Sequence, residues 1–430
     1  MFLIIKLYSF SFLSFNNTII PFYDRITKGD RVKKISIKRW LVVTMVFAVF
    51  ANVAHPVTPK FIKQLGLGDS MFGYAFAGMA ITNFLFSPLW ARIAKKYGSV
   101  KVTVTTLFFY AVSQLMFGLS TTTFTIMFAR LFGGFFIGGL FVAQLLYIVN
   151  NASPEEKGSA MVTNATMHIV FGTFGYLLGG LIGDVEIIYA FYFQVAGLLL
   201  LTLYVLLFIG DNSDNYSKKA FKLEEVNPFI SLRSFEIKSN PIIKTVFIVS
   251  ILASTATVLY DQSFNYYMAD FFNFPPSING YVKAITGILA FITNSTLTIW
   301  IIKKTDLLKS LGAIFLTSAL FIFLLINIEI PFIFLAVNIG YFAIHAGYQP
   351  ILQNFVTDAA VDQTAAIGTL NSLKSLGMII GAIIAGSAYA IDKKLPFVLS
   401  IIIYVTSSII TFRLFNKNKE NSKKVKLKNI

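Results

Sequence analysis

Long runs of apolar residues, separated by short polar stretches, recur along the chain from about Leu41 to Phe415. About twelve such runs occur. A bilayer core about 30 Å thick is crossed by about 20 consecutive apolar residues of α-helix. Because hydrocarbon offers no water to unpaired backbone groups, each run must be helical. The pattern therefore predicts an all-α polytopic membrane protein with twelve transmembrane helices.

The polar stretch 211–240 divides the predicted spans into two sets of six. The first set comprises Leu41–Phe61, Phe72–Ile93, Val102–Leu119, Phe124–Val149, Gly158–Gly183 and Ile187–Ile209. The second set comprises Ile242–Phe271, Asn279–Ile302, Leu307–Ile328, Phe332–Val356, Ala365–Ile391 and Pro396–Phe415. We predict an N-terminal six-helix bundle at 38–210, a central cytoplasmic loop at 211–240, a C-terminal six-helix bundle at 241–416 and a basic cytoplasmic tail at 417–430.

The first 37 residues are apolar at their start, but Lys6, Asn16 and Asn17 interrupt the run. Neither the basic start nor the small-residue cleavage site of a signal peptide is clear. We interpret residues 1–37 as a cytoplasmic N-terminal extension, which an upstream start codon would explain. A thirteenth span is the alternative.

The two sets of spans resemble one another. A shift of 207 residues superposes Glu155 on Asp362, Asn164 on Asn371 and Gly179 on Gly386. Because six spans return the chain to the same side, the two halves would run in parallel. Parallel repeats are typical of transporters whose substrate site lies between the halves near the bilayer midplane.

Composition excludes several classes of function. The chain has no Cys and three scattered His, which leaves no thiolate site and makes a zinc site improbable, so no metal is predicted. The connections are too short for a soluble catalytic domain. No G-x-x-x-x-G-K-[ST] loop occurs, so ATP bound to this chain cannot drive transport. We therefore expect no cofactor, with a proton gradient as the energy source.

The net charge of +16 follows the topology. If odd-numbered spans run outward, the inner segments carry most Lys and Arg, and the outer loops carry only Lys60, Lys63, Lys393 and Lys394. This bias predicts that both termini are cytoplasmic. Anionic membrane lipid is the expected partner of the basic residues, and nucleic acid is not.

The connection between the second and third spans reads SPLWARIAKKYGSVKV, from Ser87 to Val102. It resembles the G-x-x-x-D-R-x-G-R-R loop of the major facilitator superfamily, particularly of its drug:proton antiporter branch. Carried over by position, Ala91 takes the first Gly, Lys95 the Asp, Lys96 the Arg and Gly98 the second Gly. We count Arg92, Lys95, Lys96 and Gly98 as the conformational motif. Lys95 replaces the family's Asp, whose carboxylate contacts a neighbouring helix end, so we expect this latch to be altered or absent.

Two further motifs carry the resemblance, which covers about residues 38–416. The sequence around Arg130, Gly134 and Gly138 is similar to the family's R-x-x-x-G pattern, and Gly172, Gly175 and Gly179 resemble G-P-x-x-G-G. Small residues at helical spacing also pack helices closely in any membrane protein, which is the alternative. The resemblance implies two six-helix bundles in the major facilitator fold, acting as a monomer.

Ionisable side chains inside spans are expensive and indicate function. Asp261 lies in the seventh span, and Arg130 lies at similar depth in the fourth. We predict that Asp261 pairs with Arg130 or with His55, and that it takes up and releases a proton as its surroundings change. A purely structural ion pair is the alternative.

Further polar groups are candidates for the substrate and proton pathway: Asn164, His168, Gln262, His345, Tyr348 and Gln349. Hydrogen bonds between helices are the simpler interpretation of most of them. Lys283 and Lys374 are expected to reach towards the interface. The aromatic run Tyr260, Phe264, Tyr266 and Tyr267 favours an interfacial belt over a site for lipophilic cations.

These observations favour a secondary active transporter of the plasma or inner membrane, which exports small amphipathic compounds or drugs in exchange for protons by alternating access. Direction and substrate depend on the resemblance. Transport of a sugar, peptide or other metabolite is the alternative. A membrane enzyme or a non-transporting scaffold is remote, because the His residues are scattered and the halves are paired.

Overall fold

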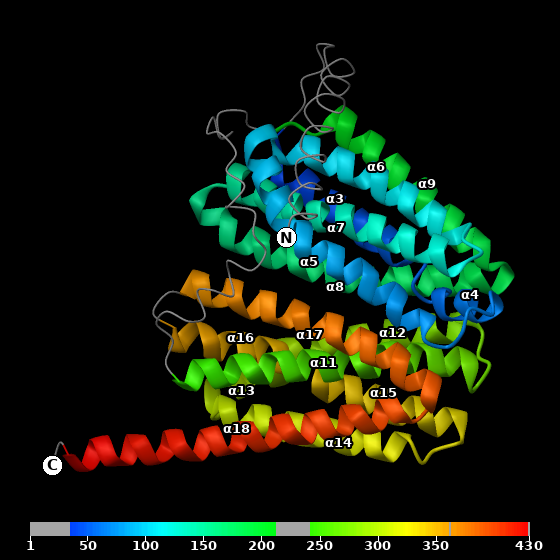
Figure 1. The fold of residues 1–430 in the computed structure, drawn as a ribbon. Helices are drawn as coiled ribbons and strands as arrows, with labels where there is room; N and C mark the ends of the chain where they lie inside the picture. The colour runs from blue at the N-terminus through cyan, green and yellow to red at the C-terminus, as the bar shows by residue number, and fades with distance from the viewer. Residues whose placement is uncertain (1–34, 212–240, 361–362, 429–430) are drawn as a thin grey trace, which may run out of the picture. The chain divides into compact units, whose positions relative to one another are not determined.

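The computed structural model describes residues 35–211, 241–360 and 363–428, and these residues are helical almost throughout (Figure 1). The predicted central loop and most of the N-terminal extension lie outside the described residues. The helices are α3 (Ile37–Asn52), α4 (Thr58–Gln64), α5 (Met71–Tyr97), α6 (Ser99–Gly118), α7 (Thr123–Asn151), α8 (Pro154–Val185), α9 (Ile187–Phe208), α11 (Pro241–Asp270), α12 (Pro276–Thr293), η4 (Asn294–Thr298), α13 (Ile299–Lys304), α14 (Leu307–Leu325), α15 (Pro331–His345), α16 (Tyr348–Ala359), α17 (Gln363–Ile391) and α18 (Leu395–Lys428).

Eleven helices among the described residues are long and apolar enough to cross a membrane. The remaining predicted span, Leu41–Phe61, is the first along the chain. It is split into the 16-residue α3 and the 7-residue α4. Pro56 lies in the intervening turn and lacks a backbone N–H, so it cannot continue the ladder of hydrogen bonds. The bend that Pro56 and Pro59 predict in this span is confirmed.

Other interruptions differ from the sequence prediction. The predicted span Phe332–Val356 breaks between α15 and α16. A π-helical stretch, η4, interrupts the predicted span Asn279–Ile302. The connection between the second and third predicted spans is almost entirely helical, because α5 continues to Tyr97 and α6 begins at Ser99. Gly98 alone makes the turn, with φ at +96°, a conformation that side chains disfavour.

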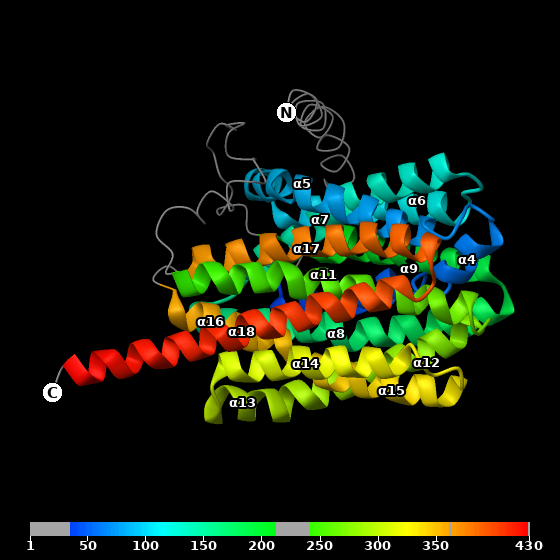
Figure 2. The ribbon, with the colours of Figure 1, turned by 60° about the horizontal axis from the view of Figure 1, so that its bottom comes forward.

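The C-terminal tail is also more regular than predicted. Helix α18 does not stop near Phe415 but continues to Lys428. In Figure 1 and Figure 2 its last part (red) extends past the other helices of the C-terminal half.

The chain forms two compact units. Unit one is made of the described residues of Met1–Phe61 and Gly78–Pro228, and unit two of those of Ile62–Ala77 and Phe229–Ile430. The first seven residues of α5 therefore pack with unit two. The functional domain bounds 38–210 and 241–416 stay a prediction, because packing in one conformation does not decide which segments move together.

The same helix pairs pack in each unit. In unit one α3 lies on α8, and α6 lies on α7 and α9. In unit two α11 lies on α17, and α14 lies on α15 and α18. These pairs correspond in chain order, first span with fifth and third with fourth and sixth. The internal resemblance seen in the sequence is thus repeated in the packing of the helices.

Aromatic side chains fill the core of unit one. Trp40 stacks on Tyr147 with ring centroids 3.8 Å apart, and its indole Nε1 donates to the carbonyl of Gln144 at 3.1 Å. Both rings are fully buried. The N-terminal end of α3 is thereby held against the C-terminal half of α7.

Candidate transport site

Asp261 forms an ion pair with Lys283 inside unit two. The ammonium Nζ of Lys283, on α12, donates to Oδ1 of Asp261, on α11. Asp261 lies nine residues before the end of α11 at Asp270, and Lys283 lies seven residues after the start of α12 at Pro276. At 1.5 Å per residue the two side chains sit at similar depth, about 10–14 Å from the connecting turn. A charge pair at this depth compensates two groups that are each costly alone.

This pair corrects the expectation for Lys283. Its side chain does not reach for the interface, because only 13% of it is exposed, and its ammonium lies 4.7 Å from the centroid of the Phe342 ring. Asp261 keeps 26% of its side chain exposed, and its neighbour Gln262 is also partly exposed. Asp261, Lys283 and Phe342 are called the charged triad below.

A fully connected polar network lies one helical turn from Asp261. The buried His345 bonds through Nε2 with Thr257 Oγ1 at 3.0 Å and with the Tyr404 hydroxyl at 3.2 Å. Its other nitrogen, Nδ1, bonds with Ser318 Oγ at 3.1 Å. The ring stacks on Tyr341 and on Tyr348. His345 therefore joins α11, α14, α15 and α18.

The predicted polar face of the tenth span continues this network. Gln349 Nε2 donates to the Tyr348 hydroxyl at 3.1 Å, and Lys374 Nζ donates to Gln349 Oε1 at 3.0 Å. Lys374 is thus bound to an amide of a neighbouring helix, which differs from the expected reach towards the interface. The polar network thus extends from His345, through Thr257 and Tyr348, to Gln349 and Lys374.

Arg130 is buried in unit one against an aromatic ring. Its guanidinium carbon lies 3.6 Å from the centroid of Phe117, and Nη1 lies 3.6 Å from the sulfur of Met79. Its Nε has no hydrogen-bond partner among the described residues. The side chain of Arg130 thus faces the interior of unit one. The pairing of Asp261 with Arg130 or His55 joins the two units and stays a prediction.

The other polar candidates of unit one bond between helices. Asn164 Oδ1 accepts from Thr44 Oγ1 at 2.8 Å, and His168 Nε2 bonds with Gln144 Oε1 at 2.9 Å. These contacts tie α8 to α3 and α7. His55 lies in the turn between α3 and α4 and stacks on Tyr176 at 5.4 Å between ring centroids. Asn164 and His168 thus match the simpler interpretation of hydrogen bonds between helices.

The glycine motifs lie where helix backbones meet. A side chain at Gly134 would collide with the Met79 carbonyl, and one at Gly138 would reach 2.8 Å from Asn83 Oδ1. Gly175 and Gly179 lie against the backbone of α3, whereas a Cβ at Gly172 would stay 3.1 Å from Asn52. These glycines allow α7 to pack on α5 and α8 on α3.

The connection between α5 and α6 holds the conformational motif, in which Lys95 stands where the family has Asp. The side chain of Lys95 is exposed near the end of α5, and Lys96 lies 5.2 Å from the Tyr97 ring centroid. An acid from elsewhere binds the start of α6: Asp211 Oδ2 accepts from the backbone N–H of Val100 at 3.0 Å. Its Oδ1 accepts from Asn151 at 3.1 Å. Sequence reasoning missed Asp211, because the polar central stretch gave no reason to single it out.

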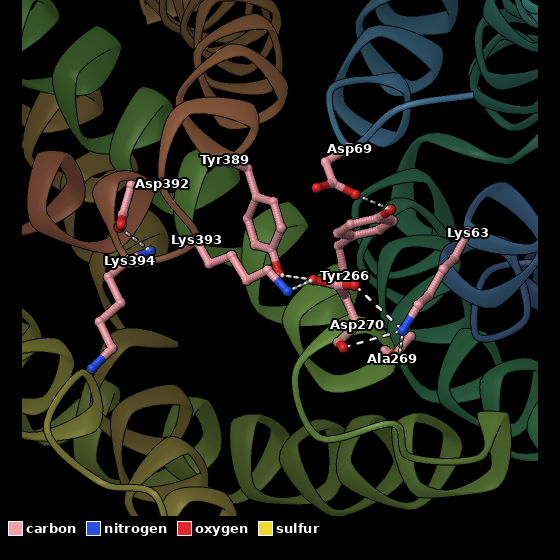
Figure 3. Close-up of polar contacts among 9 residues, drawn as sticks. All are labelled: Lys63, Asp69, Tyr266, Ala269, Asp270, Tyr389, Asp392, Lys393 and Lys394. Carbon is pink, nitrogen blue, oxygen red and sulfur yellow. Dashed lines mark hydrogen bonds and ion pairs between the residues drawn. The ribbon is translucent and has the colours of Figure 1, made fainter. Parts of the chain in front are cut away.

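Sequence reasoning also missed a cluster of charged side chains around Asp270, at the end of α11. Figure 3 shows Lys63 and Lys393 approaching the carboxylate of Asp270 from opposite sides, at 3.3 and 2.6 Å. Tyr389 donates to the same carboxylate at 3.1 Å, and Tyr266 donates to Asp69 at 2.9 Å. These six residues, the Asp270 cluster, tie Lys63 and Asp69, which precede α5, to the ends of α11 and α17. The two lysines were expected only as outer-loop charges.

The aromatic run of α11 does not form an interfacial belt. Tyr260, Phe264, Tyr266 and Tyr267 are all at most 5% exposed, so that prediction is wrong. Tyr260 donates to Asn338 Oδ1 at 2.5 Å, and Phe264 stacks on Phe334. Their sequence pattern marks apolar character, but it does not tell a lipid-facing ring from a ring packed between helices.

No group of three or more His, Asp and Glu that could hold a metal ion occurs within residues 35–211, 241–360 and 363–428.

The family model described as Major Facilitator Superfamily matches residues 40–363. The chain therefore belongs to the major facilitator superfamily, and it is a multi-pass membrane transporter rather than an enzyme. Membership confirms the resemblance and the all-α major facilitator fold, and it implies a small-molecule substrate.

Relatives with multidrug resistance names are similar to most of the chain. It is 25% identical over 382 residues to Multidrug resistance protein 1 of Bacillus subtilis (strain 168), covering 85% of this chain and 93% of that protein. It is 24% identical over 364 residues to Quinolone resistance protein NorA of Staphylococcus aureus (strain MSSA476), covering 83% and 91%.

Solved structures share the fold at lower identity. The nucleoside transporter NupG matches with a TM-score of 0.69 and 14% identity, covering 89% of this chain and 99% of that chain. A D-xylose-proton symporter matches with a TM-score of 0.66 and 14% identity, covering 87% and 97%. These likenesses show the architecture and do not identify a substrate.

Proposed function

We propose that the protein exports small amphipathic compounds, drugs among them, in exchange for protons by alternating access. The observation that carries this proposal is Asp261, a partly exposed carboxylate nine residues inside α11. A charge so deep in a span is a functional group by default. The names of the relatives support export of drugs as the substrate class.

Asp261 supplies the group that a proton-coupled transporter needs. When deprotonated it is held by the Lys283 ammonium, and when protonated it no longer compensates that cation. Alternation between the two forms would link the uptake of one proton to a change in the surroundings of Lys283. The energy then comes from the proton gradient, because the sequence holds no phosphate-binding loop for ATP.

The same proposal includes the setting of the molecule. It acts as a monomer in the plasma membrane, with both termini in the cytoplasm and anionic lipid beside its basic inner segments. The excess of Lys and Arg in the predicted inner segments supports this orientation.

A screen of expressing cells tests this function. Cells are grown and loaded with a panel of cationic, neutral and zwitterionic amphipathic dyes and drugs, with and without a protonophore. We expect expression to raise tolerance and lower dye content, and the protonophore to abolish both effects. Accumulation of a sugar, peptide or nucleoside with no change for any amphipathic compound would overturn export of drugs and favour the metabolite transporter.

A further inference from the structure

Lys283 is a tethered cation that occupies the contacts a substrate cation would use. Its ammonium holds the Asp261 carboxylate and also lies over the face of Phe342, 4.7 Å from the centroid. A carboxylate and a ring face are the two groups that recognise organic cations in proteins. The chain thus contains the elements of a cation site and fills that site with its own side chain.

We propose that the charged triad sets the charge selectivity of transport, and that Lys283 is the specificity-determining residue. With the pair intact, the triad carries no net charge. It then favours amphipathic substrates without net charge, including zwitterions that place an anion at Lys283 and a cation at Asp261. A monocation must displace the lysine from both partners. This inference deepens the proposed function and assumes transport of small amphipathic molecules.

The surroundings support this assignment. Asp261 keeps 26% of its side chain exposed, whereas Lys283 is 13% exposed and its ammonium is directed at the carboxylate and the ring. Lys374 offers a comparison within unit two, because its ammonium donates to the amide oxygen of Gln349. Removing the Lys374 charge therefore exposes no carboxylate.

Binding of two probes of nearly equal size and opposite charge tests the proposal. Tetraphenylphosphonium and tetraphenylborate are titrated into the purified, detergent-solubilised full chain by calorimetry. The variants are Lys283→Met, Lys283→Arg, Asp261→Asn and the double variant Lys283→Met/Asp261→Asn, with Lys374→Met as the matched control.

We expect Lys283→Met to bind tetraphenylphosphonium about tenfold more tightly than the wild type, because the carboxylate and ring face become available. Asp261→Asn should instead tighten tetraphenylborate by a similar factor, since the lysine loses its partner. The double variant should show neither gain, and Lys283→Arg and Lys374→Met should keep the charge preference of the wild type.

The proposal is overturned if Lys283→Met changes both probes equally or neither, or if Lys374→Met reproduces its effect. The Asp261→Asn arm keeps the test decisive if the methionine variant does not fold. Because binding is measured without a gradient, loss of proton-driven export in the cell screen would remove the proposed function and leave this result standing. Failure of the binding test alone would remove only the role of Lys283.

Discussion

Single ionisable side chains inside spans determine what this chain can do, because each one costs free energy unless another group compensates it. The depth of Asp261 and Arg130 was readable from the sequence by counting residues from the span ends. The partner of Asp261 was not, since pairing depends on which helices meet. Counting from the turn between α11 and α12 would have found Lys283, because both residues lie at similar distance from it.

Neutralising Asp261 tests its part in coupling. We expect Asp261→Asn to lower pH-driven transport in vesicles to the level of protein-free vesicles, because an amide cannot carry the proton. The protein should still insert and elute as a folded species. Asp306→Asn is the matched control, since Asp306 only caps α14 and asparagine caps equally well. Undiminished proton-driven flux in Asp261→Asn would remove this carboxylate from the mechanism.

We predict that Arg130 supports transport but lowers the stability of the folded protein. Its Nε is buried without a hydrogen-bond partner among the described residues, and such a group costs about 1–3 kcal/mol. Arg130→Met should therefore raise the melting temperature in detergent while reducing transport. A methionine variant that is less stable than the wild type, or equally active, would contradict this account. A double-mutant cycle with Asp261 then measures whether the two residues are coupled.

At the scale of elements, helix positions followed from hydrophobic length, because the bilayer sets the length of every span. The bend after α3 was predicted from Pro56, since proline removes a donor wherever it stands. The break at Ala346–Gly347 and the π-helical η4 were not predicted. Pro350 lies four residues after Ala346 and cannot bond to its carbonyl, so the first break has a mark in the sequence that the span prediction did not use. No proline lies within η4.

Two glycines of α8 provide a matched test of helix packing. A Cβ at Gly179 would collide with the backbone of Val53, whereas one at Gly158 meets nothing within 4 Å. We expect Gly179→Ala to lower the free energy of unfolding by about 1–3 kcal/mol. Gly158→Ala should instead raise it by up to about 1 kcal/mol, the ordinary helix preference. Equal shifts in melting temperature for the two variants would refute the close approach of α8 and α3.

The Asp270 cluster is expected to hold the start of α5 in place. Because the chain has no Cys, the variant Ser70→Cys gives a single labelling site next to Asp69. Adding Asp270→Asn should speed its reaction with a maleimide about two- to fivefold, as expected for exposed ion pairs worth about 0.5–1 kcal/mol. Asp392→Asn is the control. Asp392 also follows α17, but its carboxylate accepts from the backbone N–H groups of Lys394 and Leu395 at the start of α18. An unchanged labelling rate would show that the cluster does not restrain this segment.

At the scale of the whole molecule, the two-fold organisation was predicted from the break at 211–240 and from the 207-residue shift. The matched packing of α3 on α8 and of α11 on α17 supports that repeat. The assignment of Ile62–Ala77 to unit two was not predictable, since this segment belongs to the first half by sequence. Contacts far apart in the chain decided it, among them Tyr266 with Asp69.

The central claim is that a proton gradient drives the movement of an amphipathic compound through this single chain. Proteoliposomes containing only the purified protein are given an imposed pH gradient, and the accumulation of a fluorescent amphipathic dye is followed. We predict accumulation that collapses when a protonophore is added and is absent with Asp261→Asn. Accumulation that is independent of the gradient, or equal in protein-free vesicles, would contradict the account.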